Sequence, residues 1–130
     1  VVLLVLSPGT TQSQSIRTCL ANDSTAAALR FLALDIMSDA AASAQALRTK
    51  YAIPTGTATD IELVQDDSIC EAVTVSLEAK GAPHQAQALV VVRLAGTHPF
   101  YLAAKRTDSV IGSAYLLNDL FSVIAEFGGH

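Results

Sequence analysis

The residues of this chain best suited to chemistry are its two cysteines, Cys19 and Cys70. They form no C-x-x-C motif and no histidine lies at ligand spacing from either, which disfavours a zinc site and a thioredoxin-type motif. We predict a disulfide that closes a loop of about 50 residues, in an oxidising compartment. Two alternatives stay open: two buried thiols, or a reactive Cys70 whose thiolate is stabilised in the first turn of a helix.

The three histidines are His84, His98 and His130, and none belongs to an HxH, HxxxH or HExxH spacing. We therefore expect ordinary loop histidines and no metal site. Cys70 with His84 or His98 would make the catalytic pair of a thiol hydrolase only if no disulfide forms. The chain has no G-x-S-x-G elbow and so no candidate serine nucleophile.

The adjacent carboxylates Asp66 and Asp67 precede a predicted helix, and helix capping explains them without a role in acid or base catalysis. Asp60 and Glu62 alone are too few for a calcium loop. Neither a G-x-G-x-x-G motif nor a P-loop occurs in the sequence. The sequence therefore predicts no catalytic residues and no cofactor.

Two helices are predicted in the first part of the chain. Capping residues at 22–24 and apolar spacings of three and four predict a first helix that ends near Ser38. Its buried stripe consists of Leu29, Leu32 and Ile36, widened by Phe31 and Leu34. The alanine-rich stretch 40–51 predicts a second helix that ends before Pro54, and one long helix kinked at Ser38 is the alternative.

A third helix is predicted from Ser68, because Ser68 and Glu71 match the S-x-x-E capping box. Gly81 and Pro83 end this helix. Its apolar stripe consists of Ile69, Val73 and Leu77. Cys70 therefore lies in its first turn.

Strands are predicted by an apolar period of two. A short strand is expected at 60–65, before the third helix, and an antiparallel meander after it. The strands of the meander are expected at 87–94, 100–105, 111–117 and 121–127. Phe121, Val123, Ala125 and Phe127 should share one face, although the last segment could instead form an amphipathic helix. We predict an α+β fold, with the N-terminal helices and one central helix on one face of a mostly antiparallel four- to five-stranded meander sheet.

Two parts of the chain are distinguished by composition. The apolar run VVLLVL, from Val1 to Leu6, leads into a polar stretch and resembles the end of a signal peptide or anchor, or else an edge strand. We therefore separate residues 1–15 from a single domain at 16–130, and expect a possible membrane contact through that run.

Charge and hydropathy limit the classes of partner that the chain is expected to bind. With 8 basic and 12 acidic residues the net charge is −4, which disfavours nucleic-acid binding. Apolar residues make up 51% of the chain, and the strand at 87–94 is apolar on both sides. One side is covered by the N-terminal segment or is kept for a protein partner. That possible interaction face consists of Leu89, Val91, Tyr101, Ala103 and Leu116.

The middle of the chain carries a hydrophobic-proline loop, a short strand ending in V-x-D-D, and a cysteine on the next helix. The matching residues are Ile53, Pro54, Ile61, Val64, Asp66, Asp67 and Cys70, with VVVRLAG at 90–96 and EFGG at 126–129. At these positions, which span about the last two thirds of the chain, the sequence resembles a loose group of small exported bacterial proteins of unknown function. The stretch 110–113 lacks the acidic turn expected there. The resemblance implies export and an α+β layout, and carries over no catalytic residues.

These observations favour a non-enzymatic binding or scaffold domain, periplasmic or extracellular and either free or membrane-anchored. Its expected role is that of an accessory subunit in a larger envelope assembly, such as a respiratory or photosynthetic membrane complex, or in an extracellular filament. One alternative is a thiol hydrolase that uses Cys70 and a loop histidine. Another is a secreted inhibitor or small-ligand carrier, with a cavity lined by Phe31, Tyr101 and Tyr115. No particular small-molecule partner is predicted.

Overall fold

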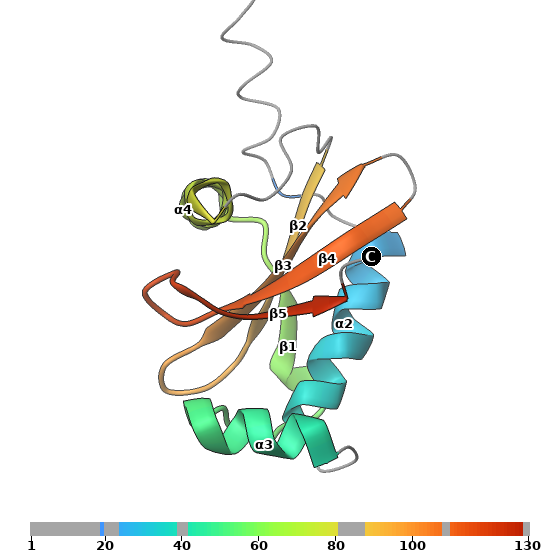
Figure 1. Ribbon diagram of the computed structural model, residues 1–130, viewed down its shortest axis with the longest axis vertical. Coiled ribbons are helices and arrows are strands. Elements are labelled where there is room, and N and C mark those ends of the chain that lie inside the picture. The colour runs from blue at the N-terminus through green and yellow to red at the C-terminus, as the bar shows by residue number, and fades with distance from the viewer. Residues whose placement is uncertain (1–18, 20–23, 39–41, 81–87, 108–109, 129–130) are drawn as a thin grey trace, which may run out of the picture.

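A computed structural model describes Cys19 and residues 24–38, 42–80, 88–107 and 110–128 of the chain (Figure 1). Within these residues, three α-helices pack against a five-stranded antiparallel sheet. The strand order is β1-β2-β3-β4-β5, so each strand pairs with the next one along the chain. The structure confirms the predicted α+β meander.

Each helix and strand predicted after residue 23 is present, with bounds that differ from the predicted ones by a few residues. The segment 1–15, with its predicted membrane contact or edge strand at Val1–Leu6, lies outside the described residues. The helices are α2 (Ser24–Met37), α3 (Ala42–Tyr51), the 3-10 helix η2 (Ala58–Asp60) and α4 (Asp67–Ala79). The strands are β1 (Ile61–Leu63), β2 (Ala88–Leu94), β3 (Phe100–Thr107), β4 (Val110–Leu117) and β5 (Val123–Gly128). The last segment is therefore a strand and not an amphipathic helix.

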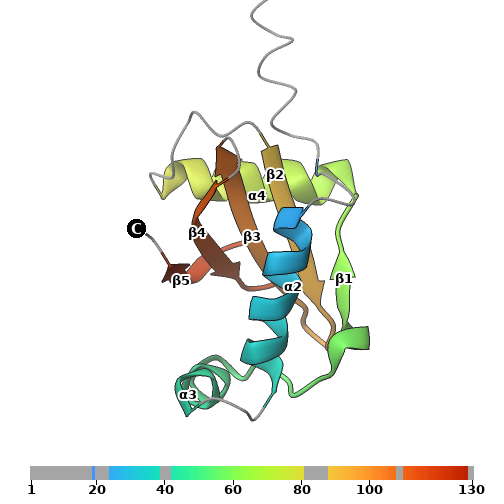
Figure 2. The same cartoon turned by 90° about the vertical axis from the view of Figure 1, so that its right-hand side faces the viewer.

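The helices lie on both faces of the sheet, which corrects the prediction that they share one face. Figures 1 and 2 show α2 on one side of the strands and α4 on the other. Neighbouring residues of β2 point to opposite faces, so Val90 and Val92 pack toward α2 while Leu89 and Val91 pack toward α4. Because all four are fully buried, the sheet needs a cover on each side.

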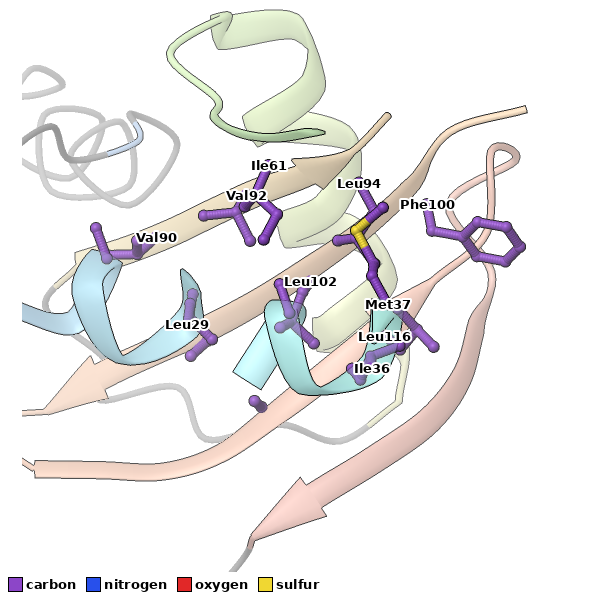
Figure 3. Packing of buried hydrophobic residues seen from close by; sticks show 14 of the residues in the cluster. Leu29, Ile36, Met37, Ile61, Val90, Val92, Leu94, Phe100, Leu102 and Leu116 are labelled. Carbon is purple, nitrogen blue, oxygen red and sulfur yellow. The ribbon is translucent and has the colours of Figure 1, made fainter. Parts of the chain in front are cut away.

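The larger core lies between α2 and the sheet (Figure 3). Leu29, Ile36 and Met37 of α2 are at most 2% exposed and face the strands. Their partners on the sheet include Val90, Val92, Leu94, Leu102 and Leu116. This packing confirms Leu29 and Ile36 as the buried stripe of the first helix.

The smaller core lies under α4. Cys70, Val73 and Leu77 are fully buried against the opposite face of the sheet. The sheet and the neighbouring segments contribute Cys19, Val64, Leu89, Val91, Tyr101, Ala103, Tyr115 and Leu117. The spacing of three and four along α4 therefore predicts its buried side correctly.

Phe31 departs from the predicted stripe. Its side chain is 73% exposed, whereas Leu29 is only 2% exposed. Two residues along an α-helix turn the side chain by about 200°, so Phe31 cannot share the direction of Leu29. Leu34 is partly buried at the margin of the larger core, as predicted.

The turn between β4 and β5 also departs from the prediction. Phe121 lies in the turn with φ 61°, and the register shifts by one residue between Leu116 and Leu117. A shift of one residue moves the following side chains to the other face. Phe121 and Val123 therefore pack toward the α4 core, whereas Ala125 and Phe127 pack toward the α2 core.

The cap of α4 is Asp66, not Ser68. The Asp66 carboxylate accepts hydrogen bonds from the backbone N–H groups of Ser68 at 2.8 Å and Ile69 at 3.4 Å. The capping box predicted from Ser68 and Glu71 therefore starts two residues too late. The carboxylate satisfies N–H groups that have no partner within the helix.

Replacement of the cap tests this assignment. We expect Asp66→Ala to lower the free energy of unfolding by about 1 kcal/mol, because two N–H groups of α4 lose their acceptor. Ser68→Ala is the matched control and should change it by less than about 0.5 kcal/mol. Urea unfolding followed by circular dichroism measures both, and a larger loss for Ser68→Ala would contradict the assignment.

Side chains from the N-terminal helices cap both edge strands. The guanidinium of Arg30 on α2 donates to the Ile61 carbonyl of β1 at 3.1 Å. The hydroxyl of Tyr51, at the end of α3, donates to the Ile124 carbonyl of β5 at 2.9 Å. Open edges of a sheet invite pairing with other chains, and these side chains occupy one acceptor on each edge.

Candidate functional site

An apolar groove of about 240 Å³ lies between α2 and the edge strand β1, which run side by side in Figure 2. Its lining consists of Ala27, Arg30, Phe31, Leu34, Ala58 and Ile61. Ala27, Phe31 and Leu34 follow one another at spacings of four and three, so they form a second stripe beside the buried one. This second stripe makes one wall of the groove, and η2 with β1 makes the other.

Phe31 is the largest apolar side chain exposed at the groove. With 73% of its surface exposed, it leaves an aromatic ring in water beside other apolar atoms. Complete burial of such a ring contributes about 1.5–3 kcal/mol. The groove therefore offers a partner a sizeable gain in free energy from a single side chain.

Arg30 is the one charged residue among those that line the groove. A guanidinium carries five N–H donors, and one of those of Arg30 donates to the Ile61 carbonyl at 3.1 Å. Among the residues that the structure describes, the other donors of Arg30 have no partner. The groove thus combines an apolar lining with a cation that can still donate hydrogen bonds.

The sequence held a signal for this site that the prediction missed. Arg30 is the only charged residue between Ser24 and Leu34, and it interrupts an apolar stretch. Apolar residues on two sides of the same helix indicate either complete burial or a second contact surface. The prediction places Phe31 in the buried stripe of the first helix or in a cavity with Tyr101 and Tyr115, and it puts the interaction face on the sheet and not on this helix.

A disulfide joins Cys19 to Cys70, as predicted, across 51 residues and with 5.8 Å between the Cα atoms. Cys19 is 7% exposed and Cys70 is fully buried. Cys19 also forms a parallel bridge with Leu89, so the bond fastens this point of the chain to both β2 and α4. Cys70 in this bond has no thiolate to offer as a nucleophile.

The interaction face predicted from the sequence is covered in the structure. Leu89, Val91, Tyr101 and Ala103 are 0–6% exposed and belong to the core beneath α4. Leu116 lies on the other face, because it pairs with Leu102 in the register of β3 and β4. The central helix α4, together with Cys19 of the N-terminal segment, covers the second apolar side of β2.

The cavity suggested for a ligand carrier is not formed. Tyr101 and Tyr115 are 6% and 7% exposed in the α4 core, and the Tyr101 ring packs on Phe121 with 5.1 Å between centroids. Phe31 belongs to α2, on the opposite face of the sheet. The three rings predicted to line one cavity therefore lie on two sides of the sheet.

Of the three histidines, only His98 lies within the described residues. Its Nδ1 is 3.1 Å from Asp119 Oδ2, and the imidazole side chain is 79% exposed. His84 and His130 lie outside the described residues. In the described part of the chain, no three side chains of histidine, cysteine, aspartate or glutamate form a group that could hold a metal ion.

Lys105 is a buried charge on the α4 face of the sheet. It is 7% exposed and pairs with Leu89 across β2 and β3. Burial lowers the pKa of its ammonium group, while the carboxylate of Glu78 on α4 acts in the opposite direction. Lys105 therefore belongs to the packing of α4 and lies on the other face from the groove.

Comparison of the chain with protein-family models, with curated proteins and with solved structures found no match. Within the residues described here, none of the helices has the length and apolar character needed to cross a membrane.

Proposed function

We propose that this chain is a non-enzymatic binding domain that works outside the cytoplasm and holds a protein partner in the groove between α2 and β1. The observation that carries the proposal is Phe31, whose ring is 73% exposed on an apolar concave surface. Aromatic side chains of this kind, when a partner buries them, supply much of the affinity of protein interfaces. In this proposal the domain is an accessory subunit of a larger assembly.

The disulfide supports the proposed compartment. A bond between Cys19 and Cys70 persists in oxidising surroundings and is rare in the reducing cytosol. The sequence motifs that resemble those of small exported bacterial proteins imply the same location. The buried position of the bond makes it part of the fold, so the groove remains the proposed contact surface.

The rigidity of its walls also favours the groove as a binding surface. Leu29 and Ile36 anchor α2 to the sheet, and β1 pairs with β2 from Ile61 to Leu63. A site on packed elements loses little conformational entropy on binding. Phe31 is thus presented by a helix whose other side is fixed in the core.

Peptide display tests the proposal without knowledge of the natural partner. The oxidised chain is immobilised, peptides are selected from a random library on phage, and affinities of the selected peptides are measured by fluorescence anisotropy. We expect Phe31→Ala to lower the affinity for the selected peptides by about tenfold or more, because the aromatic anchor is lost. Since Phe31 is exposed, its replacement should change the free energy of unfolding by less than about 0.5 kcal/mol.

Val75→Ala is the matched control. Val75 is 56% exposed on α4, on the other face of the sheet, and its replacement should leave the affinities unchanged. The proposal fails if no peptide is enriched above an empty surface. It also fails if the selected peptides bind the Phe31→Ala variant as tightly as the parent chain.

A further inference from the structure

We infer that the groove recognises the carboxyl-terminal end of a partner polypeptide, with the terminal carboxylate on Arg30 and an apolar last side chain against Phe31. This inference rests on the proposed function, because it names the chemistry of the ligand in the same groove. Three features of the groove support it: the open donors of Arg30, the orientation of the β1 backbone, and the size of the apolar space.

The first feature is the position of Arg30. Its guanidinium is held at the groove by one bond to the Ile61 carbonyl at 3.1 Å. Its remaining N–H donors are unoccupied by any residue that the structure describes. A planar guanidinium pairs with a carboxylate through two parallel hydrogen bonds, and such charge-assisted bonds are stronger than neutral ones. Arg30 is therefore a pre-positioned receptor for one carboxylate.

The second feature is the backbone of β1. The Ala95 N–H donates to the Asp60 carbonyl at 2.8 Å, and the Val64 N–H donates to the Val91 carbonyl at 2.9 Å. Hydrogen-bonding groups alternate in direction along a strand, so Asp60 and Val64 face β2 while Ile61 and Leu63 face the open edge. The bond from Arg30 to the Ile61 carbonyl agrees with this alternation.

This alternation sets the direction of the ligand. The N–H and carbonyl of Leu63 face the edge and have no partner among the described residues. An extended peptide that pairs with Leu63 and ends at Arg30, beside Ile61, runs antiparallel to β1. Addition of a strand to a sheet edge, with a pocket for its side chains, is a common mode of peptide recognition.

The third feature is the size of the groove. Its volume of about 240 Å³ is below the range of roughly 300–1,000 Å³ that is usual for small-molecule clefts. The space suits the side chain of a terminal residue better than a bulky ligand. An apolar residue fits best, because Ala27, Leu34 and Ala58 surround the space with carbon atoms.

A pair of matched peptides tests the inference. The probe is an N-acetylated, fluorescently labelled hexapeptide that ends in two leucines, made once as the free acid and once as the carboxamide. We expect the oxidised chain to bind the free acid about tenfold or more tightly than the carboxamide, because only the acid forms charge-assisted bonds. Arg30→Gln should remove this preference, while its amide can still donate to the Ile61 carbonyl.

Two controls make the result specific. Arg30→Lys keeps the charge but not the planar fork, so it should retain part of the preference for the free acid. Decanoate offers a carboxylate on an apolar chain without a peptide backbone and should compete poorly. Circular dichroism verifies that each variant is folded before binding is measured.

The contrary outcomes separate this inference from the proposed function. Equal binding of acid and carboxamide, binding of neither, or preferred binding of decanoate overturns the inference. If display-selected peptides still depend on Phe31 in that case, the groove remains the partner site. If they do not depend on Phe31, the proposed function fails and the inference fails with it.

Discussion

A variant without the disulfide, Cys19→Ala with Cys70→Ala, should lose about 4 kcal/mol of its free energy of unfolding. The bond joins residues 51 positions apart, and the loss reflects the greater freedom of the unfolded chain once the link is removed. Measured as a thermal midpoint, this corresponds to a decrease of about 15 °C for a domain of this size. Urea unfolding of the oxidised parent chain and of the double variant measures the difference.

The loss should also be uneven across the molecule. The bond joins Cys19 to the first turn of α4, on the side of the sheet with the smaller core. We therefore expect amide hydrogen exchange to accelerate more in α4 than in α2. The single variant Cys19→Ala should lose nearly as much stability as the double variant. A loss below about 1 kcal/mol, or equal acceleration in both helices, would show that the bond does not fasten α4.

The second large effect is expected from Leu102→Ala. Leu102 is fully buried in the central strand β3, between its neighbours Val92 and Leu116, and it faces α2. Truncation removes apolar contacts and leaves a cavity, which costs about 3–4 kcal/mol at sites of this kind. The unfolding midpoint in urea should decrease accordingly, with an unchanged dependence on urea concentration.

Leu120→Ala provides the matched comparison, since the same side chain is truncated where it is 78% exposed. Its expected effect is below about 0.5 kcal/mol. Similar losses for the two variants would mean that Leu102 does not lie in a closely packed core.

Most of the fold could be predicted from local patterns. The apolar spacing in α2 and α4, and the change to a period of two after Pro83, place the helices and strands in their observed order. The cap of α4 was placed two residues late because Asp66 and Ser68 are both good capping residues. Which of the two residues caps α4 depends on where the chain leaves β1. Local sequence patterns do not determine that point.

The arrangement of the helices on the two faces of the sheet could be predicted less well from the sequence. An apolar residue at each position from Leu89 to Val92 indicates a strand buried on both sides, but not which element covers each side. The choice of α4 depends on long-range contacts, which include the bond from Cys70 to Cys19 and the packing of Val73 and Leu77 on the sheet. The bulge at Leu116 and Leu117 was missed for a similar reason, because its cost and gain depend on tertiary packing.

The groove shows a different limit of sequence reasoning. Phe31 is apolar and lies in an amphipathic helix, so its type alone suggests burial. Its exposure follows from the rotation of α2 about its axis, which is set by Leu29, Ala33 and Ile36 against the sheet. Sequence patterns identify the apolar residues but do not separate a wide buried stripe from two narrower ones.

The capped edges of the sheet bear on how the chain avoids self-association while it is being made. Arg30 and Tyr51 both precede β1 in the chain. They are therefore synthesised before the edge strands β1 and β5 to which they donate hydrogen bonds. When β1 or β5 is synthesised, the residue that donates to its edge carbonyl is already part of the chain. The order of translation thus provides one occupied acceptor on each edge, which limits indiscriminate strand pairing but leaves the Leu63 groups of β1 to the proposed ligand.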